Sequence, residues 1–317
     1  MAVAMDLEGW VPIRLFWRED RPWLDWCQLG DRRLTEPFFD HAIENCFRDP
    51  YCLLFRRETP VDALTETAVP AAEPSGFIFH MSRCGSTLLA QMLATLPYGN
   101  VVSEASLIDA LLRAPVPEQQ RITWLRGIVM ALGRPPRTSG QPYFVKFAGW
   151  NTLFLPLIQR AFPTVPWVFL YREPVEVLVS LARNPGRLVP GAMDSAVLGL
   201  EPATVSAIPI EEYHARVLKR ICDMAIQSRR SGSSLFINYR ELPDSAWTLL
   251  PDFYGFACSD VELDAMRERA RFGGKDPGAL FQTDSPEKQT VATTAQRDAA
   301  DRWLHSCFEQ MERVSRL

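Results

Sequence analysis

The segment GFIFHMSRCGSTLLAQML, residues 76–93, constrains the fold more than any other part of this chain. An apolar run is followed by a short turn containing Gly85, and then by a segment with helical periodicity. In such a strand–turn–helix unit, backbone N–H groups and the helix N-terminus converge on one point and bind anions. Ser86 and Thr87 add hydroxyl groups, and Arg83 adds a planar cation suited to phosphate or sulfate oxygens. The segment therefore predicts a phosphate-binding loop.

The loop differs from that of a nucleotide kinase. A kinase loop places a lysine before its last Ser or Thr, with the lysine on the terminal phosphates and the hydroxyl on Mg²⁺. Here Ser86 follows Gly85 directly and the turn holds no lysine. A kinase stays open as an alternative, but it predicts a loop lysine and a strand-end aspartate that the sequence does not show in place. An ordinary capped turn is the other interpretation of the motif alone.

From residue 77 onward, apolar runs alternate with helical segments. The runs cover residues 77–81, 100–104, 141–147 and 165–173, and a later run, 234–242, ends in a polar corner. Strands that are apolar on both faces and separated by helices are typical of a parallel sheet covered on both sides. The fold class is therefore predicted as α/β, a parallel sheet flanked by helices.

Residues 1–63 form a different, tryptophan-rich block. Strands are predicted at 12–19, 23–30 and 51–57, with a helix at 36–47. We interpret this block as a small β-rich appendage, a module or lid on the main domain. The stretch 64–76 is rich in Pro and Ala and poor in bulky residues, which is typical of a linker. The main domain is then 77–317.

Composition narrows the function classes. The net charge is −4, so no overall basic field attracts nucleic acid or anionic lipid. The seven cysteines are scattered without a CxxC pair, which disfavours a disulfide framework or a metal site and fits a cytoplasmic location. The first residues lack the features of a signal peptide, and no apolar run is long enough to span a bilayer.

A second segment, REPVEVLVS, strengthens the phosphate-binding prediction. It places Arg172 at the carboxyl end of the strand at 165–173, and Ser180 eight positions later in the following helix. Ligands of open α/β sheets sit at the carboxyl ends of strands. An arginine there and a serine two helical turns on are placed to hold one phosphate from two sides.

Together these segments resemble the sulfotransferase family, whose donor is 3′-phosphoadenosine 5′-phosphosulfate (PAPS). SRCGST resembles the family's phosphosulfate loop, and REPVEVLVS its arginine–serine pair spaced by eight. FINYREL resembles a strand corner of the family, and RARFGGKDPGALF, residues 269–281, a late basic loop that closes over the nucleotide. The resemblance covers about residues 76–290 and leaves the first 63 unexplained.

The resemblance implies a P-loop-NTPase-like sulfotransferase fold and a nucleotide site without a metal. The loop residues would hold the 5′-phosphosulfate, Arg172 and Ser180 would hold the 3′-phosphate, and later residues would complete the site. The implied donor-binding set is Arg83, Cys84, Gly85, Ser86, Thr87, Arg172, Ser180, Tyr239, Arg271 and Lys275.

The resemblance also implies catalytic roles. Arg83 and Lys146 correspond to cations around the leaving phosphate. The cytosolic type uses a histidine base after that lysine, where this chain has Phe147 and Ala148, so Glu104 is the expected base, as in the protein-tyrosine and carbohydrate type. The implied reaction moves a sulfuryl group from PAPS to a hydroxyl or amine of a small-molecule, sugar or peptide acceptor and releases PAP. A non-catalytic PAP- or PAPS-binding protein is the third alternative, and the acceptor, the oligomeric state and the role of 1–63 stay open.

Overall fold

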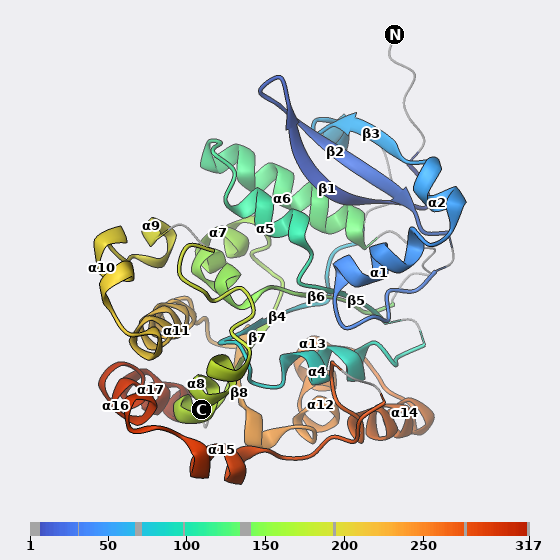
Figure 1. The fold of residues 1–317 in the computed structure, drawn as a ribbon. Helices are drawn as coiled ribbons and strands as arrows, with labels where there is room; N and C mark the ends of the chain where they lie inside the picture. The colour runs from blue at the N-terminus through green and yellow to red at the C-terminus, as the bar shows by residue number, and fades with distance from the viewer. Residues whose placement is uncertain are drawn as a thin grey trace.

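Five parallel strands form the centre of the molecule (Figure 1). The computed structural model describes residues 7–30, 32–66, 72–97, 99–133, 141–192, 195–275 and 278–315. The strands are β4 (Gly76–His80), β5 (Asn100–Ser103), β6 (Tyr143–Lys146), β7 (Trp167–Tyr171) and β8 (Ser234–Asn238), in the order β5-β6-β4-β7-β8. All four pairings are parallel, which confirms the predicted α/β class.

Helices cover both faces of this sheet. Figure 1 shows α4, α12, α13 and α14 on one side and α5, α6 and α7 on the other. The helices between β4 and β8 are α4 (Ser86–Leu93), α5 (Ser106–Leu112), α6 (Glu118–Leu132), η1 (Gly149–Phe154), α7 (Leu155–Ala161), α8 (Pro174–Arg183), α9 (Ser195–Leu198), α10 (Pro202–Ala207) and α11 (Ile210–Gln227). Those after β8 are η2 (Tyr239–Glu241), α12 (Ser245–Thr248), α13 (Leu250–Tyr254), α14 (Asp260–Ala270), α15 (Ser285–Val291), α16 (Thr294–Trp303) and α17 (His305–Ser315).

The strands are buried because their residues are apolar on both faces. Every residue of β4, β5, β6 and β7 is buried. Phe79 of β4 stacks on Phe147, with ring centroids 4.7 Å apart, and its edge meets the Trp167 ring. Aromatic pairs of this kind add to the stability that burial alone provides. The two-sided burial explains why the strands could be predicted from continuous apolar runs.

The N-terminal block folds as a three-stranded antiparallel sheet in the order β1-β2-β3. Its elements are β1 (Trp10–Arg18), β2 (Arg21–Gln28), α1 (Phe39–Cys46), α2 (Pro50–Leu54), β3 (Arg57–Pro60) and α3 (Ala63–Glu66). β1 packs against α5 and α6 of the main domain. Trp10 and Trp26 serve packing, since both are buried and Trp26 donates its indole N–H to Thr59 at 2.9 Å, whereas Trp17 is exposed.

The prediction of a strand at 51–57 is wrong, because Pro50–Leu54 form a helix. Asp49 caps a short helix there by accepting from the Tyr51 N–H at 2.9 Å, and Pro50 stands in the first helical turn. A proline in the first turn is preset for a helix, because its fixed φ fits and its missing N–H is not needed there. The third strand therefore begins only at Arg57. Part of the predicted linker, residues 67–71, lies outside the described residues, so the domain boundaries stay a prediction.

Candidate active site

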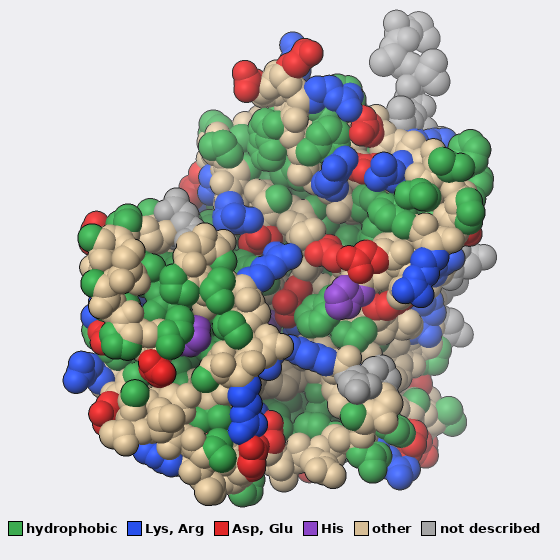
Figure 2. All heavy atoms as spheres, viewed as in Figure 1, with side chains coloured by type: hydrophobic (Ala, Val, Ile, Leu, Met, Phe, Trp, Pro, Cys, Tyr) green, Lys and Arg blue, Asp and Glu red, His purple; other side chains and the backbone are tan. Residues whose placement is uncertain are grey.

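The carboxyl ends of all five parallel strands open onto one cavity of about 430 Å³. Ser82 follows β4, Glu104 follows β5, Ala148 follows β6, Arg172 follows β7 and Tyr239 follows β8, and all five line the cavity. The parallel sheet brings these positions to one edge, although they are spread over much of the sequence. On the face shown in Figure 2, charged side chains of both signs and a histidine gather near the middle, below the N-terminal sheet.

The loop between β4 and α4 has an unusual backbone. Ser82, Arg83 and Gly85 all have positive φ angles, of 83°, 52° and 84°. For residues other than glycine such angles are costly and persist only where the surroundings hold them, often at functional sites. A Cβ on Gly85 would lie 2.7 Å from a Leu242 methyl carbon and 2.9 Å from the Tyr239 ring. The loop thus needs glycine here for conformation and for space.

Two cations face the cavity at this loop. Arg83 is half-buried, and Lys275 lines the same wall from the loop after α14. Neither has a hydrogen bond or ion pair to another described residue. Gly274 allows the loop that carries Lys275 to approach α4 closely, because a Cβ on Gly274 would lie 2.6 Å from the backbone nitrogen of Leu88. The late basic loop therefore packs directly on the first turn of α4, whose own N–H groups lack a side-chain cap.

The surroundings of Lys275 and Arg83 lower the pKa of both groups. Burial and the nearby Arg83 charge, against the opposing charge of Glu104, together lower the pKa of Lys275 to about 8. Burial also lowers the pKa of Arg83, against the opposing charge of Asp284. Two neighbouring positive groups, one half-buried and one exposed, that form no ion pair with a described residue are stabilised by an anion placed between them. This wall of the cavity is suited to phosphate or sulfate.

Glu104 sits at the other side of the cavity in an ion pair with Lys146. In the sheet, Lys146 pairs with Ser103, so Glu104 leaves its strand beside the lysine and binds its Nζ through Oε1. The Lys146 side chain is fully buried, whereas that of Glu104 is 22% exposed. Glu104 has a φ of 52°, which makes it the third non-glycine residue with a positive φ at the site, after Ser82 and Arg83.

His80 completes this cluster. Its Nδ1 accepts from the Ser82 N–H at 3.1 Å, which places the proton of the neutral ring on Nε2. Nε2 lies 3.4 Å from Glu104 Oε1. Burial lowers the pKa of His80, so the ring is neutral. Burial would raise the pKa of Glu104, but Lys146 and His80 together hold it well below its usual range. The carboxylate is therefore ionised at neutral pH.

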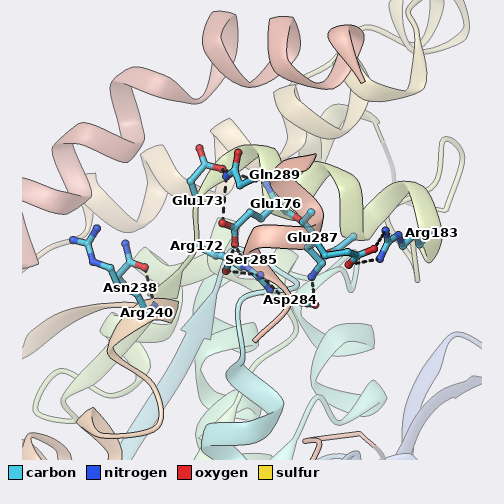
Figure 3. A network of polar contacts seen from close by, with 12 residues as sticks. Arg172, Glu173, Glu176, Arg183, Asn238, Arg240, Asp284, Ser285, Glu287 and Gln289 are labelled. Atoms are coloured by element: carbon cyan, nitrogen blue, oxygen red, sulfur yellow. Dashed lines mark hydrogen bonds and ion pairs between the residues drawn. The ribbon is translucent and has the colours of Figure 1, made fainter. Parts of the chain in front are cut away.

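Arg172 and Ser180 also line the cavity, and Figure 3 shows the carboxylates around Arg172. Arg172 Nε donates to Glu176 Oε2 at 2.6 Å, and its Nη2 donates to Asp284 Oδ1 at 2.5 Å. The guanidinium lies over the Tyr239 ring, 3.9 Å from its centroid. The Ser180 hydroxyl donates to the Glu176 carbonyl at 2.8 Å. The predicted arginine–serine pair thus faces the cavity, but its arginine already carries two carboxylates.

Most of the predicted site residues meet at this cavity. It is lined by Arg83, Cys84, Gly85, Ser86, Thr87, Glu104, Arg172, Ser180, Tyr239 and Lys275. Lys146 reaches it through Glu104. Arg271 is not brought in, because its side chain is 65% exposed and pairs with Glu268 on the surface. Cys84 donates to the Leu170 carbonyl, and burial raises its pKa to about 12, so its thiol is not a nucleophile.

Several lining residues were missed by the sequence reasoning. The N-terminal block contributes Phe38 and His41, and Asp40 ties that block to α5 by accepting from the Ser106 hydroxyl at 3.0 Å. Trp150 stands opposite, its indole N–H held by the buried Asp109 at 2.6 Å. Asp284 and Lys288 come from the C-terminal part of the chain. None of these stands in a recognisable motif, and only the tertiary fold brings them here.

Two negative findings concern the described residues only. Within the described ranges, no helix is long and apolar enough to cross a bilayer. In the same part of the chain, no group of three or more His, Cys, Asp or Glu side chains is arranged to hold a metal ion.

No family profile matches the chain, and no curated protein sequence does. Several solved structures, in contrast, are similar to the chain. A sulfotransferase domain from the curacin biosynthetic pathway is 16% identical over 73% of this chain and 98% of its own, with a TM-score of 0.42. A sulfotransferase from Alicyclobacillus acidocaldarius is also 16% identical, over 76% and 99% of the two chains, with a TM-score of 0.39. Retinol dehydratase in complex with androsterone and the inactive cofactor PAP is 13% identical over 87% and 93%, with a TM-score of 0.35. The chain is thus similar to solved sulfotransferases, and the case for an activity rests on the residues of the cavity.

Proposed function

We propose that this protein is a sulfotransferase that moves a sulfuryl group from PAPS to a hydroxyl group of a small-molecule acceptor. The observation that carries the proposal is the joint lining of one cavity by the Arg83 loop, Glu104 and the pair Arg172 and Ser180. These are the parts that such a reaction needs: a cradle for the phosphosulfate, a base for the acceptor, and a second anion site for the 3′-phosphate.

The cradle fits a phosphosulfate. The N–H groups at the start of α4 and the uncompensated charges of Arg83 and Lys275 point to a shared anion. Such fixed donors stabilise charge that develops on a leaving group, and they act most strongly away from bulk water. PAPS supplies an activated sulfur atom with PAP as its leaving group. The loop needs no metal-binding lysine–serine pair for this chemistry.

Glu104 is placed to take the acceptor's proton. Lys146 and His80 both contact Oε1, so Oε2 is the oxygen left to face an acceptor. In the proposed step the acceptor oxygen bonds to sulfur, the bond from sulfur to the 5′-phosphate oxygen breaks, and the acceptor proton passes to Glu104. A carboxylate with a lowered pKa is a weak base, but the attacking oxygen becomes acidic as its bond to sulfur forms.

The acceptor end of the cavity combines flat apolar walls with charge. Phe38 and Trp150 line it, and Arg187 lies over Trp150 with its guanidinium carbon 5.9 Å from the ring centroid. The N-terminal block supplies one of these walls, which supports a role for residues 1–63 in shaping the acceptor site. The volume of about 430 Å³ suits a small molecule beside the donor.

Thermal unfolding with added nucleotides tests the donor. A ligand that binds only the native state raises the melting temperature. We expect PAP to raise it and ATP with Mg²⁺ to leave it unchanged, and we expect the Arg83→Met variant to lose the response to PAP. Stabilisation by ATP with Mg²⁺ and not by PAP would instead identify a kinase. An acceptor screen by mass gain of one sulfuryl group then separates an enzyme from a non-catalytic PAP-binding protein.

A further inference from the structure

Arg172 is paired with Glu176 and also with a second carboxylate, Asp284, which an arginine that only binds a 3′-phosphate does not need. The Asp284 carboxylate lies between two cations, with Oδ1 2.5 Å from Arg172 Nη2 and Oδ2 2.5 Å from Lys288 Nζ. Each oxygen of one carboxylate therefore holds a different positive group, as two oxygens of a phosphate would. All three residues line the cavity.

The two acids on Arg172 differ in how firmly they are held. Glu176 belongs to α8, its side chain is 8% exposed, and Ser285 donates to its Oε2 at 2.8 Å. Asp284 stands before α15, and its side chain is 42% exposed. Moving Asp284 into solvent rehydrates its charge, whereas the Glu176 carboxylate is nearly buried and is also held by Ser285 and Gln289. Asp284 is the partner that can leave.

Lys288 shows that an anion is required at this spot. Its side chain is only 7% exposed, and within the described residues Asp284 is its one ion-pair partner. A buried ammonium group without a partner is costly. When Asp284 leaves, another anion must therefore neutralise both Lys288 and Arg172.

We propose that Asp284 is an internal competitor for the 3′-phosphate of the donor, and that Lys288 is a phosphate-binding residue uncovered when Asp284 is displaced. This inference rests on the proposed function. The phosphate takes the place of the carboxylate between Arg172 and Lys288, and Asp284 turns outward, which loosens the start of α15, where Ser285 contacts Arg172 and Glu176. Asp284 thereby sets how strongly the site prefers a 3′-phosphorylated nucleotide over one without that phosphate.

Calorimetric titration with PAP and with AMP, which lacks the 3′-phosphate, tests this. We expect Asp284→Asn to increase the preference for PAP over AMP about ten-fold, since it removes the competing charge while keeping a similar shape. Lys288→Met should decrease that preference. Glu287→Gln is the matched control, because it removes the same charge from the same helix, where Glu287 pairs with Arg183 outside the cavity lining (Figure 3). It should leave the preference unchanged.

A preference that is unchanged or smaller in Asp284→Asn overturns the inference. If PAP binds the wild type and Asp284→Asn shows the same preference for PAP over AMP as the wild type, only the competitor role of Asp284 is contradicted. If neither PAP nor AMP binds the wild type or the variant, the proposed function is contradicted together with this inference. Hydrogen–deuterium exchange on the wild-type protein gives a readout that does not depend on a variant folding. PAP, but not AMP, should increase exchange at the backbone amides of residues 284–291, and equal exchange with both nucleotides contradicts displacement.

Discussion

His80 Nε2 lies 3.4 Å from Glu104 Oε1, the same oxygen that binds Lys146. Within the described part of the chain, Glu104 Oε2 receives no such contact. Two contacts on one oxygen fix the rotation of the carboxylate and leave the second oxygen for a reacting group. Because His80 is neutral and its Nε2 only approaches Glu104 without a hydrogen bond of good geometry, we interpret it as a positioning residue for Glu104 rather than as a base.

The proposed base can be tested by Glu104→Gln. We expect kcat to fall by about 10²- to 10⁴-fold, the usual range for losing a general base, with PAP affinity retained. Glu118→Gln, which alters an exposed ion pair with Arg160, is the control and should change neither quantity. Steady-state kinetics with any acceptor from the mass-gain screen give kcat, and calorimetry gives the affinity. Unimpaired turnover in Glu104→Gln would exclude this residue as the base.

Donor affinity should depend on pH through Lys275. Its pKa is lowered to about 8 by burial and by Arg83, so it loses its charge as the pH rises through that value. Only the protonated form attracts an anion, and PAP affinity should therefore weaken above pH 8, by up to about ten-fold per pH unit. Lys275→Arg keeps the charge and should remove this dependence. The same inflection in that variant would assign it to another group.

Gly274 should be intolerant of a side chain. A Cβ at this position would lie 2.6 Å from the Leu88 nitrogen, and backbone cannot yield there as a flexible side chain can. We expect Gly274→Ala to displace the loop that carries Lys275, to lower stability by about 1–3 kcal/mol and to weaken PAP binding. In Gly127→Ala the new Cβ meets only the Leu64 side chain, so PAP affinity should not change. Unfolding in urea and calorimetry measure the two effects, and normal PAP affinity in Gly274→Ala would argue against contact between this loop and the nucleotide.

Arg172 should be important for stability as well as binding. Arg172→Met leaves the buried Glu176 without its cation, and breaking a buried pair in this way costs about 3–5 kcal/mol. Arg183→Met breaks an exposed pair with Glu287 and should cost far less, because solvent screens that pair. Urea denaturation of both variants measures the difference. Equal costs would show that the Arg172 cluster contributes no more than a surface pair.

The N-terminal block should affect the acceptor more than the donor. Phe38→Ala removes one apolar wall of the cavity, so we expect the acceptor KM to rise, with a smaller loss of PAP affinity because the same ring lies 5.8 Å from Lys275 Nζ. Phe55→Ala is the control, because that ring is 59% exposed and does not line the cavity. A loss of PAP affinity with an unchanged acceptor KM in Phe38→Ala would assign the contact of this block to the nucleotide and not to the acceptor.

The sequence by itself determined the sheet strands, the loop and the positions of the strand-end residues. Those features depend on contacts within a few residues: apolar runs make buried strands, a glycine permits the turn, and the spacing of eight puts Ser180 two helical turns beyond Arg172. Glu104 and Lys146 could be placed at one edge because parallel strands end together. The segment 51–57 was mispredicted because the cap at Asp49 and the proline after it outweighed an apolar pattern.

Only the tertiary structure decided which charges neutralise one another. Asp284 and Lys288 reach Arg172 from more than a hundred residues away, and Phe38 reaches the cavity through the packing of the N-terminal block on α5. An ion pair depends on distance and burial, and neither is a local property of the chain. The sequence therefore predicted the cations of the site, whereas the fold showed which of them are already in ion pairs and which, Arg83 and Lys275, form no ion pair or hydrogen bond with another described residue.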